Sequence, residues 1–335
     1  MIIALDAMGG DFAPNVTIEG AVLAAQHEDR NILLVGPEKL LLNKLEKYKN
    51  NNRLAYNKIE IIDANESILM SEHPAKAVRH KKNSSIAVCA KLVADKKADA
   101  FVSMGNSGAI MTAALLYLGR LRGILRPAIT TVLPTTKGAC ILADIGANVD
   151  CKPEYLFQFG IMSSIFCKKV IKIKKPKVAL LSIGEEASKG NELTLATYSL
   201  LNKTIGINFI GNIEGKDICH GKADVVICDG FTGNILLKFG EGITDTMLYL
   251  IKQKILSSPI KWFLLPFFHL IKKTLQTKFD YSRIGGAPLL GVNGVCIVGH
   301  GRSNSIAVKN AVAAAVETVK YDVLNEIESN LHRYL

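Results

Sequence analysis

Short runs of apolar, β-branched residues alternate along the chain with longer windows in which apolar residues recur at helical spacing. The short runs are apolar at nearly every position, which is typical of strands that are buried on both faces of a parallel sheet. They predict strands at Ile2–Leu5, Ile32–Val35, Ile59–Ile62, Ala100–Ser103, Ile129–Leu133, Ala139–Ile145, Lys177–Ile183, Ile207–Ile210, Val225–Ile227 and Val295–Val298. The longer windows predict helices at Asn15–Gln26, Glu38–Lys49, Ser84–Lys97, Gly108–Gly119, Pro153–Phe166, Glu192–Leu201, Gly233–Ile255 and Ser305–Asn325.

This alternation predicts a doubly wound α/β fold with a largely parallel sheet. We expect one catalytic domain over residues 1–335, because no internal repeat or low-complexity linker divides the chain. In such sheets ligands bind beyond the carboxyl ends of the strands, so the loops that follow the strands are the candidate site.

Three glycine-rich or polar loops follow predicted strands in the first half of the chain. Asp6–Pro14 and Ser103–Ala109 combine glycines with polar groups before a helix, an arrangement in which backbone N–H groups can face an anion. Asp144–Asn148 adds an acid and an amide. An ordinary capped turn explains each loop about equally well. The candidate substrate-binding residues here are Asp6, Gly9, Gly10, Ser103, Asn106, Ser107, Gly108, Asp144 and Asn148.

Three further loops in the second half of the chain carry candidate donors. Lys189 lies in a polar loop after a predicted strand, where a lysine can stabilise developing negative charge or simply face solvent. Thr232 and Asn234 stand at a helix start, where either can cap the helix or bind an anion. His300 lies between glycines and is either a structural histidine or an acid–base group.

The loops lack the motifs of nucleotide binding and of covalent catalysis. There is no GxGxxG, no Walker A loop and no GxSxG. Several anion-friendly loops without a nucleophile favour a small anion such as phosphate that attacks its substrate directly.

Composition narrows the class of protein. With 49% hydrophobic residues the chain must bury a core, which excludes a disordered protein. The seven cysteines are scattered without metal-site spacing, so we expect no metal. The net charge of +11 indicates a solvated lysine surface, an acidic partner or a membrane surface, whereas nucleic-acid motifs are lacking. The N-terminus does not resemble a signal peptide and no apolar run reaches 18 residues, so we expect a cytoplasmic protein.

Residues 244–274 depart from the strand–helix rhythm. Helical patterning on both sides of Ser257-Ser258-Pro259 predicts an amphipathic hairpin. Residues 251–279 contain six lysines and no acid beside an aromatic cluster, a pattern typical of elements that lie on anionic lipid. Packing within an oligomer or within the core are the alternatives. The candidate membrane contacts are Trp262, Phe263, Leu264, Phe267 and Phe268.

Taken in order, these loops resemble the PlsX family, the phosphate acyltransferases of bacterial phospholipid synthesis. The resemblance covers almost the whole chain and rests on Asp6–Pro14, Ser103–Ala109, Asp144–Asn148, Ser182–Glu192, Gly211–Gly215, Cys228–Asn234 and Gly285–Gly291, with His73-Pro74, Lys81–Ser85 and Arg126-Pro127 in addition.

The resemblance implies a reaction in which a fatty acyl-[acyl-carrier protein] and inorganic phosphate give acyl phosphate, which feeds a membrane glycerol-3-phosphate acyltransferase. It also implies a fold similar to phosphotransacetylases and isocitrate dehydrogenases, a homodimer at the membrane surface, and no metal or nucleotide cofactor. The functional lysine and asparagine proposed for the family correspond to Lys189 and Asn234.

Two other functions remain open from the residues. A phosphotransacetylase acting on short-chain acyl-coenzyme A would share the fold and the phosphate chemistry but has less use for a basic, aromatic hairpin. A non-enzymatic carrier-protein-binding scaffold would explain the hairpin but not the anion-type loops. Candidates for docking an acidic carrier protein are Arg120, Arg122, Arg126 and Lys137.

The hairpin prediction is testable with lipid vesicles. A protein carrying Trp262→Glu and Phe267→Glu should no longer float with anionic vesicles, because two charges would enter the apolar side of the interfacial element. Flotation on a density gradient measures this, with the unaltered protein on the same vesicles as the control. If the double variant floats as the unaltered protein does, the hairpin is not the anchor.

Overall fold

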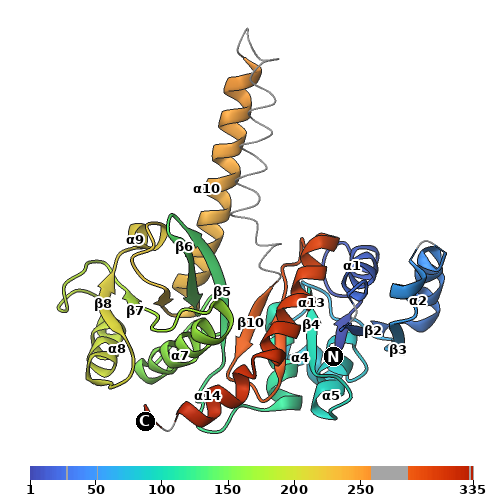
Figure 1. The fold of residues 1–335 in the computed structure, drawn as a ribbon, viewed down its shortest axis with the longest axis horizontal. Coiled ribbons are helices and arrows are strands. Elements are labelled where there is room, and N and C mark those ends of the chain that lie inside the picture. The colour runs from blue at the N-terminus through green and yellow to red at the C-terminus, as the bar shows by residue number, and fades with distance from the viewer. Residues whose placement is uncertain (28, 51, 258–285, 332, 335) are drawn as a thin grey trace.

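The computed structural model describes residues 1–27, 29–50, 52–257, 286–331 and 333–334 (Figure 1). Its strands are β1 (Ile2–Asp6), β2 (Asn31–Gly36), β3 (Ile59–Asp63), β4 (Ala100–Ser103), β5 (Ala128–Thr135), β6 (Gly138–Ala143), β7 (Val178–Leu181), β8 (Phe209–Ile213), β9 (Val225–Ile227), β10 (Ala287–Leu290) and β11 (Val295–Val298). Its α-helices are α1 (Asn15–Ala25), α2 (Glu38–Leu45), α3 (Arg53–Tyr56), α4 (Pro74–His80), α5 (Ser85–Ala94), α6 (Ser107–Ala113), α7 (Pro153–Phe166), α8 (Glu192–Lys203), α9 (Gly215–Cys219), α10 (Gly230–Leu256), α13 (Ser305–Lys320) and α14 (Val323–Leu331).

The described strands form one sheet in the order β3-β2-β1-β4-β11-β10-β5-β6-β9-β7-β8. Two parallel blocks make up most of it. The first block is β3-β2-β1-β4-β11 and the second is β6-β9-β7-β8. Between the blocks, β10 and β5 form the antiparallel pairings. The largely parallel α/β fold predicted from the apolar runs is therefore confirmed.

Strand β10 joins the two blocks by changing partner along its length. Ala287 and Pro288 pair with β11, whereas Leu289 and Leu290 pair with β5. The sequence reading treats this segment as loop, which is wrong. A proline and flanking glycines are loop signals, and four residues give too little pattern to oppose them. Pairing on both sides of the strand is what makes this segment part of the sheet.

Helices cover both faces of the first block because its strands are apolar on both faces. Ile3 and Leu5 of β1 pack with residues of α1 and α13, while Ala4 between them packs with residues of α5 and α6. In the second block, α7 and α14 cover one face. The other face packs against Ile218 of α9. All side chains of β4, β9 and β11 are thus removed from water, and this burial of apolar surface is the main driving force for the fold.

The predicted helices are confirmed apart from their ends, and the structure adds elements that the pattern misses. The window Ser305–Asn325 divides into α13 and α14, because Asp322 adopts a left-handed backbone with φ of 52°. The short helices α3, α4 and α9 were not predicted, since four to seven residues are too few to show helical periodicity.

Helix α10 extends well away from the rest of the molecule (Figure 1). Of its residues, Gly230 and Gly233 near its start are buried, whereas most of its length is open to solvent. The helix forms the first part of the predicted 244–274 hairpin. The proposed membrane contacts Trp262, Phe263, Leu264, Phe267 and Phe268 lie outside the described residues. In the part of the chain that the structure describes, no helix combines the length and the apolar character that crossing a membrane requires.

The contact between α1 and α13 depends on a residue without a side chain. A Cβ atom added at Gly20 would lie 2.6 Å from Cγ1 of Val308, far inside van der Waals contact. We expect Gly20→Ala to lower the free energy of unfolding by about 1–3 kcal/mol through overpacking, even though alanine favours helix more than glycine does.

Urea denaturation followed by circular dichroism measures this change. The matched control is Gly240→Ala in α10, where the described residues leave open space around the added methyl group. That variant should be neutral or more stable by up to about 1 kcal/mol. Equal stability of the two variants would contradict the close packing of α1 on α13.

Candidate active site

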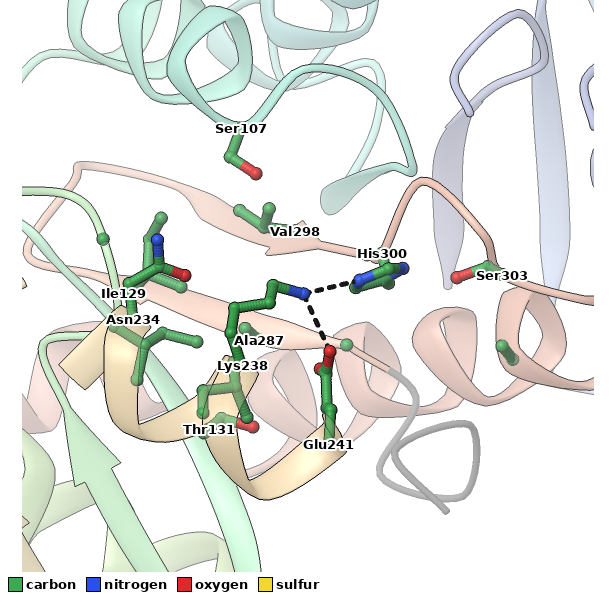
Figure 2. Close-up of a pocket in the computed structure, with 16 residues that line it drawn as sticks. Ser107, Ile129, Thr131, Asn234, Lys238, Glu241, Ala287, Val298, His300 and Ser303 are labelled. Atoms are coloured by element: carbon green, nitrogen blue, oxygen red, sulfur yellow. Dashed lines mark hydrogen bonds and ion pairs between the residues drawn. The ribbon is translucent and has the colours of Figure 1, made fainter. Parts of the chain in front are cut away.

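A cleft of about 210 Å³ lies where the two parallel blocks face each other (Figure 2). The first block contributes the start of α6, the end of β11 and the loop after it, and α13. The second contributes α10 and the loop after β6, while β5 and β10 lie between. The polar residues that line it are Ser107, Thr131, Asn234, Lys238, Glu241, His300 and Ser303. Its apolar walls are Ile129, Ile145, Leu237, Ala287, Val298 and Ala307.

One face of α10 forms a wall of this cleft. Asn234, Lys238 and Glu241 are spaced by four and three residues, so they share one side of the helix. The helix starts at Asp229, whose carboxylate accepts the Thr232 N–H at 2.8 Å and the Thr232 hydroxyl at 2.8 Å. The cap is therefore Asp229 and not Thr232 or Asn234, because a carboxylate before the first turn satisfies a free N–H. The Asn234 amide is left facing the cleft, and it lacks a hydrogen-bond partner among the described residues.

The Lys238 side chain reaches across the cleft towards His300 (Figure 2). Its Nζ lies 2.8 Å from Nε2 of His300 and 2.9 Å from Oε2 of Glu241. The other ring nitrogen, Nδ1, accepts the backbone N–H of Arg302 at 3.1 Å. Burial and the charge of Lys238 lower the pKa of His300 below its ordinary value. The ring is therefore mainly neutral at pH 7.

Asp144 organises the loop after β6 from a fully buried position. One carboxylate oxygen accepts the N–H groups of Ile129, Gly146 and Ala147, and the other accepts both the backbone and the side-chain N–H of Asn148. Asn148 also donates to the Pro127 carbonyl at 2.7 Å. Burial raises the pKa of Asp144, and these hydrogen bonds oppose that rise. The Asp144 carboxylate and the side-chain NH₂ group of Asn148 are thus engaged within the protein.

A second buried carboxylate accepts hydrogen bonds in the same way at the end of β1. The buried Asp6 carboxylate accepts the Ser103 hydroxyl at 2.6 Å and the Met8 N–H at 3.0 Å. Burial raises the pKa of Asp6, and the hydrogen bond from Ser103 opposes the rise. A Cβ at Gly9 would lie 2.5 Å from this carboxylate, and Gly10 has a φ of 99°. These residues therefore hold two loops together beside the cleft and do not line it.

The residues of the loop at Asn106 have two different roles. Asn106 and Gly108 make contacts within the protein, whereas Ser107 lines the cleft. The Asn106 side-chain oxygen accepts the Ala109 N–H at 3.1 Å, and its amide nitrogen donates to the carbonyls of Met70 and Glu72. Gly108 packs closely on Pro74. Ser107 alone of the predicted residues in this loop lies on the cleft wall, where Figure 2 shows its hydroxyl directed towards the opposite side.

Lys189 lies beyond the carboxyl ends of the strands, as the cleft does, but outside the cleft itself. It is exposed in the loop after β7, and its backbone is held by Glu186 and Ser182. Between β7 and the cleft-lining loop after β6 stands β9, so Lys189 and Asn234 do not share the cleft wall. The structure therefore brings together Asn234, Ser107 and His300 from the predicted set, but not Lys189.

Burial makes several thiols of this chain poor nucleophiles. Burial raises the pKa of Cys151 to about 12, and burial also raises the pKa of Cys140 and Cys228. No cysteine is among the residues that line the cleft. Within the described residues, no three His, Cys, Asp or Glu side chains are grouped in a way that could hold a metal ion.

Lys238 and Glu241 are site residues that the motifs did not reveal. They lie inside a helix and not in a loop after a strand, so the search for loop chemistry passed over them. The available signal was their spacing from Asn234, because a helix that presents one polar residue to a cleft presents the residues four and seven positions later as well.

The comparisons with known proteins identify the family. Residues 1–326 match the family described as "Fatty acid synthesis protein". A "Phosphate acyltransferase" of Endomicrobium trichonymphae is 61% identical over 334 residues, covering 100% of this chain and 98% of that protein. Another, of Pelotomaculum thermopropionicum, is 50% identical and covers 99% of this chain and 95% of its own. The chain belongs to the phosphate acyltransferase family. It is accordingly an acyltransferase.

Solved structures agree with the fold. The EutD phosphotransacetylase from Staphylococcus aureus superimposes with a TM-score of 0.59 at 16% identity, covering 96% of this chain and 94% of that one. A phosphotransacetylase from Streptococcus pyogenes gives 0.59 at 18% identity, with the same coverage. At this identity the likeness concerns the α/β architecture alone, as the sequence pattern predicts.

The Asp144 loop gives a prediction on stability. Asp144→Asn replaces an accepting oxygen by an NH₂ group that faces N–H donors, so at least one buried donor loses its acceptor. We expect the free energy of unfolding to fall by about 1–3 kcal/mol. Urea denaturation measures it, with Asp150→Asn on the exposed end of the same loop as the control. No loss relative to that control would show that the loop does not depend on the carboxylate.

Proposed function

We propose that the protein transfers a fatty acyl group from acyl-[acyl-carrier protein] to inorganic phosphate, giving acyl phosphate for phospholipid synthesis. Membership of the phosphate acyltransferase family supports an acyl donor and phosphate as the reactants. The observation that carries the proposal is the division of the cleft, which has apolar walls at Ile129 and Val298 and polar donors at Asn234 and Lys238. Apolar walls suit an acyl chain, and convergent donors suit phosphate and a developing oxyanion.

The proposed reaction is a direct displacement. A phosphate oxygen bonds to the thioester carbonyl carbon, the carbon–sulfur bond breaks, and the proton of hydrogen phosphate ends on the departing thiol. The tetrahedral intermediate carries an oxyanion, which a pre-positioned donor stabilises more than it stabilises the substrate. The amide of Asn234 faces the cleft and is the donor that the geometry favours. Lys189 is the second donor that the family resemblance implies, and its place outside the cleft makes its role the weaker of the two.

The proposal also includes three partners: a second copy of the chain, an anionic membrane surface and the acyl-carrier protein. Along α10, apolar side chains are open to solvent, including Phe239 at 68%, Met247 at 59% and Leu250 at 59%. This supports the homodimer and the anionic membrane surface as partners, since exposed apolar stripes mark interaction surfaces. Peripheral attachment would deliver acyl phosphate to a membrane glycerol-3-phosphate acyltransferase. Arg120, Arg122, Arg126 and Lys137 are exposed and stay the candidates for docking the acidic carrier protein.

One assay tests the reaction. The protein is given long-chain acyl-[acyl-carrier protein], the matching acyl-coenzyme A or a short-chain acyl-coenzyme A, each with and without inorganic phosphate, and acyl phosphate is measured as its hydroxamate. We expect product with the carrier-protein donor and phosphate together. A preference for short-chain acyl-coenzyme A would instead identify a phosphotransacetylase, and acyl release that ignores phosphate would overturn both activities.

The oxyanion donors give a prediction on rate. Asn234→Ala should lower kcat by about 10²–10³, the usual cost of losing one donor to an oxyanion, and Lys189→Ala should do the same if it acts on the oxyanion. Neither side chain packs in the core, so circular dichroism should show intact folds. Asn202→Ala on exposed α8 is the control. A folded Lys189→Ala with near-normal kcat would remove Lys189 from the mechanism, and the same result for Asn234→Ala would remove Asn234.

A further inference from the structure

Three polar side chains on the cleft wall have no hydrogen-bond partner in the part of the chain that the structure describes. They are the hydroxyl groups of Ser107 and Thr131 and the amide of Asn234. The ammonium group of Lys238 on the same wall, by contrast, donates to Glu241 at 2.9 Å. A polar group that lines a cleft and is not engaged within the protein is available to a ligand.

Thr131 brings its hydroxyl to the cleft from the middle of the sheet. Thr131 and Ile129 on β5 both line the cleft, because alternate residues of a strand point to the same side. Thr130 between them points to the other side, where it is buried and its hydroxyl donates to the Pro288 carbonyl at 3.2 Å. The hydroxyl of one threonine is therefore satisfied within the protein, whereas its neighbour's is directed to the cleft.

The wall around Thr131 is otherwise apolar. Ile129 of the same strand, Ala287 of β10 and Val298 of β11 line the same cleft. A hydroxyl in such surroundings costs free energy unless a partner accepts its hydrogen bond. Valine has the same branched shape and suits a strand at least as well. The sheet alone thus gives no reason for a hydroxyl here, and a contact with the ligand does.

Thr131 and Asn234 lie on the same side of the cleft (Figure 2). A Cβ atom at Gly146 would lie 3.9 Å from Cβ and Cγ of Asn234. The residue before it, Ile145, donates its N–H to the carbonyl of Ile129 at 3.1 Å. Ile129 is two positions from Thr131 on β5. Two uncharged donors, one from a strand and one from a helix, are therefore placed beside each other.

We propose that Thr131 is a catalytic residue whose hydroxyl donates a hydrogen bond to the oxyanion of the tetrahedral intermediate, together with the amide of Asn234. This inference rests on the proposed function. It assigns to a group inside the cleft the role of second donor that the family resemblance gives to Lys189.

The step conserves atoms and charge. A phosphate oxygen bonds to the carbonyl carbon, and the electron pair of the carbonyl bond moves to its oxygen, which accepts from Thr131 and Asn234. When the pair returns, the carbon–sulfur bond breaks and the thiolate takes the proton of hydrogen phosphate. The proton of the Thr131 hydroxyl stays on Thr131 throughout, so the residue stabilises charge and transfers nothing.

An uncharged donor with apolar neighbours suits an oxyanion better than phosphate. The hydrogen bond to the neutral carbonyl oxygen is weak and strengthens as negative charge develops on that oxygen. Phosphate is charged before the attack, so a donor to phosphate would already strengthen the binding of the substrate. The two roles therefore give different kinetics. Loss of an oxyanion donor lowers kcat, whereas loss of a phosphate contact raises the KM for phosphate.

The variant Thr131→Val tests the assignment, because it removes the hydroxyl and keeps the shape. We expect kcat to fall by about 10²–10³, the usual cost of one oxyanion donor. The KM values for phosphate and for acyl-[acyl-carrier protein] should each change by less than about 3-fold, since the contact is made in the transition state. Thr131→Ser restores a hydroxyl and should recover most of the rate. Thr136→Val in the exposed turn after β5 is the matched control and should leave kcat unchanged.

Urea denaturation of the same variants separates catalysis from folding. Thr131→Val should be as stable as the unaltered protein, because among the described residues its hydroxyl has no partner to lose. An unchanged kcat in folded Thr131→Val would overturn the assignment, and so would a rise in the phosphate KM at unchanged kcat. A fall in kcat that follows a loss of stability and is not recovered by Thr131→Ser would also overturn it. If the unaltered protein forms no acyl phosphate, the proposed function itself fails, which is a separate outcome.

Discussion

The buried carboxylate of Asp144 is the interaction on which the cleft depends. It gathers five N–H donors from β5 and from its own loop, and this fixes the end of β6. The start of α10 packs directly on that loop, since a side chain at Gly230 or Gly233 would collide with Asp144. The first turns of α10 therefore take their position from one acid. The position of the helix start also determines where the later residues of α10 lie, among them Asn234, Lys238 and Glu241.

Both parallel blocks use a buried aspartate to satisfy the N–H groups of a loop that follows a strand. Each ends a central strand with an aspartate that turns inward, Asp6 in the first block and Asp144 in the second. Each carboxylate satisfies N–H groups of a tight loop that would otherwise be buried without partners. The cost of burying a charge is offset by these hydrogen bonds, and the result is a stiff loop. Stiff loops on both sides of a cleft hold its walls at a defined distance.

The strands and the loops after them can be predicted from the sequence. The sequence does not distinguish the residues that hold a loop in place from those that line the cleft. Continuous apolar runs and glycine-rich turns are local, so the sheet blocks and the polar strand ends were predictable. Asp6, Asp144 and Asn148 looked like ligand groups because a polar residue after a strand has the same local pattern whether it faces inward or into a cleft. Only the three-dimensional contacts separate the two. Strand β10 and the position of Lys238 in the cleft wall depend on partners far away in the sequence, which local pattern does not contain.

The chain order of the sheet has a consequence for synthesis on the ribosome. The four strands of the second block are complete once Ile227 is made. The first block starts earlier but closes later, because β4 pairs on one side with β1 and on the other with β11, which spans Val295–Val298. An unpaired strand edge is a template for pairing with other chains. During elongation the earlier half of this protein thus carries an open edge at β4 for nearly two hundred residues, until β11 pairs with it.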